Sequence, residues 1–514
     1  MSNIWIKKPI SAFEADMKKS ELKRVLGKWS LTAIGIGAII GGGIFVLTGT
    51  GAYYNAGPAL ALSFVIAGIA CVFAALCYAE FASILPVEGS AYAYAYGTVG
   101  EIFAWIIGWG LILEYAMGSM TVAVSWSGYF NKLLKMFGLH LPDWLTNDPK
   151  TFAAMGGEGF SMNLPAFLIV LFVISILVKG TKGAAKANNL IVIMKVSAVL
   201  FVIIAGAFFV NTENWVPFIP EATTIIEKDA THHAYGIQGI ISGAAAIFFA
   251  YVGFDAVSTQ AGEAINPKKD VPFAIISSLL ICTALYILVS LVLTGMMHYT
   301  DFNPLGKYPD AIKAPVAYAF DIAGQAWAGY IITIAATIGL ISVLMVMIMG
   351  QSRIFLGMSK DGLIPKVFSQ VNQETGTPQR NLLILGGIIA VVAAFTPIND
   401  LAHMTSFGTL FAFTMVCVAV WILRVKEPNL VRSFKVPALP VIAISGILIN
   451  LYLIINLSDD AKKYSLIWLL IGVIIYFLYS KRNSKLQKTG GFGETFKAEQ
   501  EPLEDIDIDI DNKN

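Results

Sequence analysis

The first long apolar segment of the chain contains, at its centre, Ile34-Gly35-Ile36-Gly37-Ala38-Ile39-Ile40-Gly41-Gly42-Gly43-Ile44-Phe45. Each glycine inside a helix costs roughly 1 kcal/mol relative to alanine, and a run of three leaves the backbone amides without side-chain cover. In hydrocarbon an unpaired amide costs several kcal/mol, so a helix break here must lie against protein or a water-filled cavity. We predict such a break, which offers free N–H and C=O groups to a small charged ligand.

A second interpretation of the same glycines stays open. Gly37-x-x-x-Gly41 has the spacing that lets two membrane helices approach closely, so the glycines also fit a packing motif. The two interpretations are compatible.

Composition indicates a polytopic membrane protein. The 514 residues have a mean hydropathy of +0.70 and only 13% are charged, against about 25% in soluble domains. The first 28 residues are polar and basic, which does not fit a cleavable signal peptide. The four cysteines all lie in apolar segments without metal-ligand spacing, so we expect no metal site and no cofactor.

Twelve apolar runs are long enough to span a bilayer, although several are near the lower limit of about 17 residues. They cover residues 30–54, 57–85, 97–129, 163–181, 186–210, 236–259, 272–298, 326–350, 381–397, 402–424, 437–457 and 464–481. We therefore predict an all-α membrane protein with a basic cytoplasmic leader (1–28) and a transporter domain (29–482). Residues 483–514 are acidic towards their end and are predicted to form a disordered cytoplasmic tail.

The distribution of basic residues predicts the orientation. With the amino terminus inside, 26 of the 35 lysines and arginines fall in cytoplasmic segments, eight fall in outer loops, and Lys195 remains within the membrane. By the positive-inside rule, both termini are expected in the cytoplasm and the protein in the cell (plasma or inner) membrane.

The first ten runs divide into two halves of five, at about 29–210 and 236–425, followed by two further helices at 437–481. The sixth run carries its own interruption, Phe248-Phe249-Ala250-Tyr251-Val252-Gly253-Phe254-Asp255. An odd number of spans per half inverts the second half, and interrupted helices at matching places in inverted halves indicate a transporter site.

Several motifs resemble the amino acid–polyamine–organocation superfamily, and in particular its bacterial cationic amino acid transporter-like branch. They are the 37–49 glycine segment, Ala56-Gly57-Pro58-Ala59, Tyr78-Ala79-Glu80, the 249–258 segment, the 266–272 run, Gly350-Gln351-Ser352-Arg353 and Lys360-Asp361-Gly362-Leu363-Ile364-Pro365. The resemblance covers about residues 25–480 and implies a LeuT-type 5+5 inverted repeat with helices 1 and 6 broken. One departure bears on pocket size and substrate choice: bacterial relatives commonly read Gly-Thr-Gly where this chain reads Gly41-Gly42-Gly43.

Substrate contacts are predicted at both breaks. The carboxylate is expected at the amides of Gly41, Gly42 and Gly43, where a helix start favours an anion. The ammonium is expected at freed backbone carbonyls, and aromatic rings of the second break can close over the ligand or simply pack. The carbonyl candidates are Ile39, Ile40, Phe249 and Val252; the ring candidates are Phe249, Tyr251 and Phe254; Ala250 and Asp255 lie in the same segment.

Ionisable residues at membrane depth are the other candidates. Lys195 is nine residues past Lys186, about 13 Å along a helix. It either faces the first run as a buried amine, where it could exchange a proton, or extends to the inner surface. In look-alikes of the family, a lysine here takes the place of a sodium ion. Glu114 and Tyr286 are candidates for polar support, Asp255 and Glu114 for a structural pair or a substrate contact, and Glu80 and Arg353 for a cytoplasmic network.

Together with the breaks, the resemblance implies secondary active transport of L-amino acids, cationic or small and neutral, by alternating access with proton symport. Alternatives of the same fold are an amino acid exchanger and a polyamine transporter. A membrane enzyme is disfavoured because His-Glu-x-x-His, Gly-x-Ser-x-Gly and Walker motifs are absent, and a channel because no filter sequence appears. The expected partners are the substrate, protons and lipid, without nucleic acid; a small membrane subunit and the oligomeric state stay open.

Overall fold

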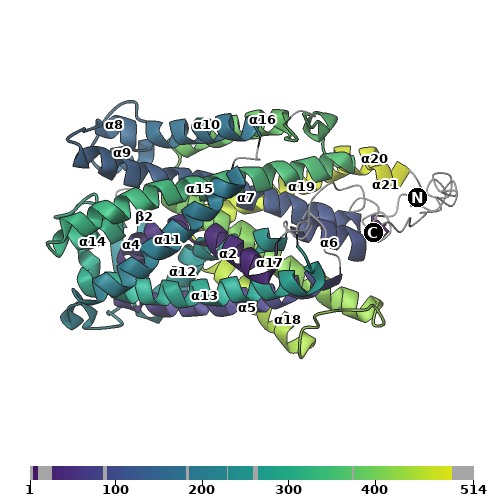
Figure 1. Cartoon of the computed structure of the whole chain (residues 1–514), viewed down its shortest axis with the longest axis horizontal. Coiled ribbons are helices and arrows are strands. Elements are labelled where there is room, and N and C mark those ends of the chain that lie inside the picture. The colour runs from purple at the N-terminus through teal and green to yellow at the C-terminus, as the bar shows by residue number, and fades with distance from the viewer. Residues whose placement is uncertain are drawn as a thin grey trace, which may run out of the picture.

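Long helices that lie along one common direction make up most of the protein in the computed structural model (Figure 1). The structure describes residues 4–9, 26–84, 90–180, 184–227, 230–258, 264–372 and 375–488. Most of the basic leader and the acidic end of the tail lie outside these residues, so the predictions for both are not addressed by the structure.

Eight helical segments among the described residues are long and apolar enough to cross a membrane, and three apolar helices are shorter. The eight are Leu47–Ile84, Glu101–Met136, Leu190–Ala207, Gly236–Ser258, Pro267–Met296, Ala326–Lys360, Ile398–Lys426 and Asp459–Asn483; the three are α10 (Leu164–Val178), α16 (Gln379–Phe395) and α18 (Leu439–Ile455). Each of the twelve predicted runs contains helix. The first run is divided between α2 (Lys28–Ile39), α3 (Gly42–Phe45), α4 (Leu47–Gly51) and the π-helical η1 (Ala52–Ala56).

The long helices pack in pairs that bring distant parts of the chain together. The most extensive contacts join α5 (Leu60–Ile84) to α13 (Pro267–Met296), and α7 (Glu101–Met136) to α15 (Ala326–Lys360) and α17 (Ile398–Lys426). The remaining span-forming helices are α11 (Ala184–Ala207), α12 (Gly236–Ala246), which continues into η4 (Ile247–Tyr251), and α19 (Asp459–Ile475), which continues into η8 (Tyr476–Ser480). α2 packs against α13 and α11, which places the first break inside the bundle.

Local sequence explains where several helices begin. Asn163 caps α10, because its Oδ1 accepts the N–H of Ala166 at 3.1 Å and Pro165 follows in the first turn. Asp148 caps α9 in the same way through Thr151 N at 3.0 Å.

The structure also contains short elements that the sequence did not predict. They are α6 (Ser90–Thr98), α8 (Asp143–Thr146), α9 (Pro149–Ala154), α14 (Pro315–Ile322), α20 (Lys481–Asn483), α21 (Lys485–Lys488), the short helices η2 (Gly57–Ala59), η3 (Thr212–Trp215), η6 (Tyr299–Phe302) and η7 (Lys366–Ser369), and the strands β1 (Thr223–Glu227) and β2 (Ala230–Ala234). The strands form an antiparallel hairpin in which Thr223 pairs with Ala234.

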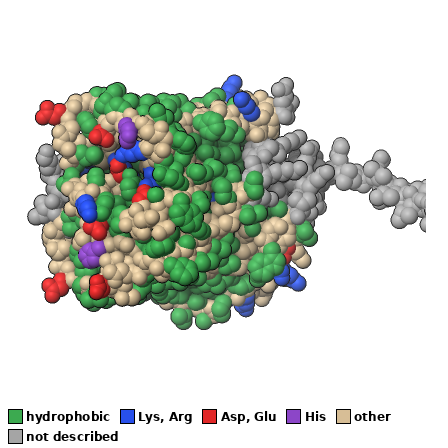
Figure 2. All heavy atoms as spheres, turned by 60° about the vertical axis from the view of Figure 1, so that its left-hand side comes forward, with side chains coloured by type: hydrophobic (Ala, Val, Ile, Leu, Met, Phe, Trp, Pro, Cys, Tyr) green, Lys and Arg blue, Asp and Glu red, His purple; other side chains and the backbone are tan. Residues whose placement is uncertain are grey.

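Charged side chains gather at one end of the molecule. Figure 2 shows lysine, aspartate, glutamate and histidine side chains on the end that carries α8 and α14 in Figure 1, whereas the adjoining flank is covered largely by hydrophobic side chains. Large apolar residues such as Leu190, Leu448 and Leu466 are more than half exposed. An apolar flank between polar ends is the surface that a bilayer requires.

The opposite end is tied together by both ends of the described chain. Backbone N–H groups of Glu101 and Ile102 bind the carbonyls of Ile6 and Ile4 at 2.9 and 3.1 Å. Glu101, which is 0% exposed, also accepts hydrogen bonds from Ser484 Oγ and from Gln487 Nε2 at 3.2 Å. Residues 483–488, which we assigned to the disordered tail, therefore belong to the folded domain, because Ser484 and Gln487 hydrogen-bond to the buried carboxylate of Glu101.

Candidate functional site

The first helix break lies at the predicted glycines, between the end of α2 at Ile39 and the start of α3 at Gly42. The last helical bond of α2 runs from Ile40 N to Ile36 O at 2.9 Å, after which Ile40 is extended and Gly41 adopts a non-helical backbone conformation. α3 begins at Gly42, and its first bonds are made by Phe45 and Val46 to the carbonyls of Gly41 and Gly42. The N–H groups at the start of a helix have no acceptor within that helix, so Gly42 and Gly43 present their amides to the surroundings.

The second break lies directly against the first. η4 ends at Tyr251, and Gly253 has a φ of +118° that side-chain-bearing residues rarely adopt. A Cβ on Gly253 would lie 2.9 Å from the carbonyl carbon and oxygen of Ala38, and one on Gly43 would lie 3.0 Å from Ala250 N. Glycine at both positions thus allows the two interrupted helices to touch through their backbones.

Two side chains bind the carbonyl groups that the breaks release. Tyr286 Oη on α13 lies 2.8 Å from Ile39 O and 2.9 Å from Ala250 O, which belong to the first and second breaks respectively. Lys195 on α11 is 1% exposed, and its Nζ donates to Gly37 O and, at 3.1 Å, to Ile40 O. Lys195 therefore faces the first helix and does not extend to the inner surface.

The position of Lys195 also depends on a third helix. A Cβ on Gly339 of α15 would lie 2.6 Å from Lys195 Cγ, so the lysine stem passes directly over this glycine. The aliphatic part of the side chain is packed between α15 and α2, and this packing fixes the amine at the end of α2.

Apolar side chains and one hydroxyl surround the exposed amides. A Cβ on Gly41 would meet both methyl groups of Val343 at 3.3 Å, and one on Gly42 would meet Ser125 Oγ at 2.6 Å and the Phe249 ring at 3.7 Å. The backbone N–H of Phe249 donates to Ser406 Oγ at 3.1 Å. Phe249 is thus held against the first break.

The two other predicted rings point elsewhere. Tyr251 Oη donates to Phe64 O of α5 at 2.7 Å, and its ring packs at right angles on that of Tyr286. Phe254 packs between Tyr78 and Phe413, with ring centroids 5.8 and 4.9 Å away. The structure therefore places both rings in the aromatic core around the second break, which corresponds to the packing alternative.

The predicted acids lie close to this core. Asp255 is 1% exposed and accepts a hydrogen bond from Tyr115 Oη at 3.0 Å. Glu114 is also 1% exposed, and neither of its carboxylate oxygens has a hydrogen-bond partner among the described residues. Gly408 of α17 lets the backbone of α7 approach closely at Glu114, because a Cβ on Gly408 would lie 3.1 Å from the Glu114 backbone.

Glu80 belongs to a separate network at the end of α5. It is 0% exposed and binds Arg424, Arg432 Nε at 3.0 Å and the N–H of Val436 at 2.8 Å. The prediction of a network residue fits these contacts, although the bases that bind Glu80 are Arg424 and Arg432 and not Arg353.

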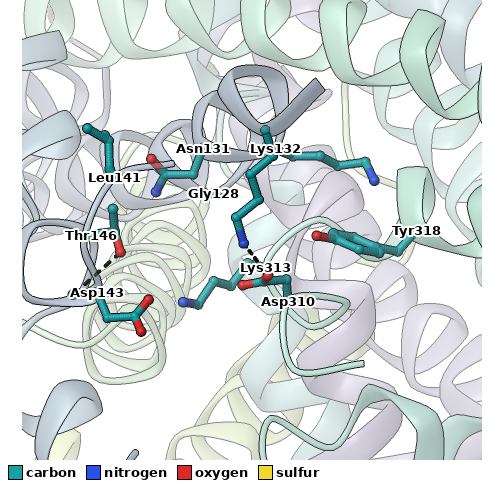
Figure 3. A pocket seen from close by; sticks show the side chains of 10 residues that line it. Gly128, Asn131, Lys132, Leu141, Asp143, Thr146, Asp310, Lys313 and Tyr318 are labelled. Carbon is teal, nitrogen blue, oxygen red and sulfur yellow. Dashed lines mark hydrogen bonds and ion pairs between the residues drawn. The ribbon is translucent and has the colours of Figure 1, made fainter. Parts of the chain in front are cut away.

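A polar hollow at the far end of α7 is too small to be the substrate site (Figure 3). Its volume is about 30 Å³, roughly the space of one water molecule. Lys135 forms an ion pair with Asp310, and Lys313 donates to Asn147 Oδ1 at 2.7 Å. Burial lowers the pKa of Lys313. Burial alone would raise the pKa of Asp310, but the neighbouring lysines outweigh it and hold that pKa below its usual value.

Sequence reasoning missed Ser125, Ser406 and Tyr115 as members of this region. A weak signal for Ser125 exists: Gly118 and Ser125 are two turns apart on one face of α7, and a Cβ on Gly118 would lie 3.7 Å from the Phe249 ring. Ser406 stands in a short run in which all residues but Phe407 are small or polar, Thr405-Ser406-Phe407-Gly408-Thr409, inside an apolar helix.

Comparison with known proteins identifies the family of the chain. The amino acid permease family matches residues 26–479. The chain is 46% identical over 470 residues (91% of this chain, 96% of the relative) to the branched-chain amino acid permease BcaP of Bacillus subtilis (strain 168). It is 43% identical over 488 residues (95% and 100%) to the methylthioribose transporter of the same organism. It is 38% identical over 410 residues (79% and 63%) to the mitochondrial cationic amino acid transporter 3 of Arabidopsis thaliana. The chain therefore belongs to the amino acid permease family, whose members are integral multi-pass membrane transporters and not enzymes.

Proposed function

We propose that the protein is a secondary transporter that moves neutral amino acids with apolar side chains by alternating access. The observation that carries this proposal is the pair of broken helices that meet at Gly43 and Ala250, with the amides of Gly42 and Gly43 at a helix start. Such amides attract a carboxylate, because the start of a helix carries a partial positive charge. A backbone carbonyl of the breaks can accept a hydrogen bond from the substrate ammonium. The single hydroxyl proton of Tyr286 binds only one of the two carbonyls of Ile39 and Ala250 at a time, so the other one is available.

The surroundings of the break favour an apolar substrate side chain. Val343, Met347 and Phe249 contribute the apolar atoms next to Gly41, Gly42 and Gly118. The charged group nearest to the first break is Lys195, and it is already bound to the backbone. The relative named for branched-chain amino acids, at 46% identity, supports the same substrate class.

Methylthioribose is a second candidate substrate. The relative named for it is 43% identical over 95% of this chain. Methylthioribose has neither a carboxylate nor an amine, so it would use the apolar side chains and the free amides as hydroxyl-binding groups. Cationic amino acids and polyamines are further alternatives, for which Glu114 and Asp255 would be the counter-ions.

The proposed architecture has twelve spans in a 5+5 inverted arrangement with both termini in the cytoplasm. The breaks support this arrangement, because they fall in the first and sixth runs and so occupy corresponding places in the two halves. The excess of lysine and arginine in the segments assigned to the inside supports the orientation and a place in the cell membrane.

We further propose that protons drive transport and that Lys195 carries the coupling. A protonated Lys195 ties α11 to the end of α2 through charge-assisted bonds to Gly37 and Ile40. Such bonds are about twice as strong as neutral ones, so loss of the proton would loosen the first break. The same contacts let the ammonium do the work that a bound sodium ion would otherwise do at these carbonyls.

The test is uptake by the purified protein in proteoliposomes. Labelled L-leucine, L-isoleucine, L-valine, L-arginine, putrescine and methylthioribose are compared, with membrane current recorded in parallel. We expect accumulation of the branched-chain amino acids that unlabelled analogues inhibit. Uptake of methylthioribose alone, or of the cations alone, would overturn the proposed substrate class. Uptake that requires substrate on the opposite side would identify exchange in place of symport.

A further inference from the structure

Ser125 has a buried hydroxyl that the protein itself does not use. The residue is 1% exposed, and its Oγ has no hydrogen-bond partner among the described residues. Other hydroxyls of α7 are satisfied: Ser119 donates to Tyr115 O at 2.7 Å, Thr121 to Met117 O at 2.8 Å and Ser127 to Asn163 Oδ1 at 2.6 Å. Buried polar groups are nearly always paired, so an unpaired hydroxyl in such a helix calls for an explanation.

The hydroxyl lies over the first helix break. A Cβ on Gly42 would lie 2.6 Å from Ser125 Oγ and 3.0 Å from Ser125 Cβ, so no atom separates the serine from the Gly42 backbone. The Phe249 ring borders the same space, 3.7 Å from the Gly42 position. The unpaired hydroxyl and the ring of the second break therefore both border Gly42, the first residue of α3.

We propose that Ser125 is a substrate-binding residue that determines specificity, and that its hydroxyl donates to the substrate carboxylate alongside the amides of Gly42 and Gly43. This inference rests on the proposed function, because it needs a carboxylate at the first break. It also gives a reason for glycine at position 42. Any side chain there would displace the serine hydroxyl from the place where it meets the ligand.

The first experiment removes only the hydroxyl. Ser125→Ala keeps the Cβ and should weaken L-leucine binding by about 10- to 100-fold, the ratio expected for one hydrogen bond to a charged group. Inhibition by 3-methylbutylamine, which is leucine without its carboxylate, should stay unchanged. Ser119→Ala is the matched control, because this buried hydroxyl is already bound to its own helix. Equal weakening of leucine and 3-methylbutylamine, or of neither, would overturn the proposal.

The second experiment tests the contact between the two helices. Gly42→Ala should weaken leucine binding by collision with Ser125, and the double variant Gly42→Ala/Ser125→Gly should bind leucine more tightly than Gly42→Ala alone. A double variant that binds leucine no more tightly than Gly42→Ala would contradict the placement of Ser125 over Gly42. This comparison keeps the proposal testable if Ser125→Ala is not recovered from the membrane.

Failure of the proposed function is distinguishable from failure of this inference. Wild-type protein that binds no amino acid refutes both the proposed substrate class and the carboxylate contact. Wild-type protein that transports leucine with an affinity unchanged by Ser125→Ala refutes only the role of Ser125.

Discussion

Replacement of Lys195 by methionine tests the coupling mechanism with little change in shape. The methionine side chain has a similar length and removes the charge, so it can occupy the space between Gly339 and α2. The variant loses bonds to Gly37 and Ile40, each about 1.5–3 kcal/mol for a charged donor. It also removes a buried charge whose desolvation costs several kcal/mol. These terms oppose each other, so we expect a folded protein.

The effect on ion selectivity can be estimated from the same geometry. A sodium ion on the carbonyls that hold Lys195, whose Nζ lies 3.1 Å from Ile40 O, would be about 4 Å from the ammonium. Two unit charges at this distance repel by about 4 kcal/mol at an effective dielectric of 20, which corresponds to about a 1000-fold loss of sodium affinity. Sodium should therefore have no role in the wild-type protein.

The assay is uptake of L-leucine into proteoliposomes under an imposed pH gradient, with sodium or choline outside. Wild-type protein should accumulate leucine equally in both salts, whereas Lys195→Met should equilibrate leucine without accumulation. Lys307→Met, at an exposed position, is the control for loss of a positive charge. The reasoning is refuted if wild-type uptake needs sodium or if Lys195→Met accumulates leucine normally. Lys195 would then have a structural role, and the assignment as a transporter would stand.

Three further predictions concern the break and the end of the bundle that carries Glu80 and Glu101. Gly43→Ala places a methyl group against the η4 backbone, an overpacking that costs about 1–3 kcal/mol, and should raise the KM for leucine. Gly387→Ala, whose Cβ would have no neighbour within 4 Å, should leave KM unchanged. Glu80→Gln breaks a buried ion-pair network and should lower the free energy of unfolding by about 3–5 kcal/mol, which thermal denaturation in detergent would report as a lower Tm. Truncation after Asn483 removes Leu486, which is 2% exposed. Because burial of such a side chain contributes about 1.5–3 kcal/mol, this truncation should lower Tm. Truncation after Lys488 should leave Tm and uptake unchanged.

Each of these predictions has an outcome that contradicts it. An unaltered KM in Gly43→Ala would mean that the two breaks do not touch as described. An unchanged Tm in the Glu80→Gln variant would mean that Arg424 and Arg432 are stabilised by other groups. Equal Tm values for the two truncations would show that the contacts of Ser484 and Gln487 with Glu101 add nothing to stability.

The sequence by itself determined the features that depend on composition along the chain. Long apolar runs must be helical in a membrane, because no other backbone arrangement satisfies its own polar groups there. Three glycines in one run and a Tyr-Val-Gly-Phe-Asp interruption in another located both breaks. Lys195 was identified because a lysine in such a run is costly unless it has a partner. Its partners are the carbonyls of Gly37, in the last turn of α2, and of Ile40, at the break that the sequence had already indicated.

Only the tertiary structure decided which side chains meet. A helix that is apolar on all sides has no polar stripe to show which face is covered by protein and which by lipid. The sequence therefore could not separate Phe249, which lies against Gly42, from Tyr251, which binds Phe64. Nor could it find Ser125, since a lone serine in an apolar helix usually bonds to its own backbone. Contacts between Glu101 and the last helices join residues almost 400 positions apart, and no local pattern encodes a distance of that kind.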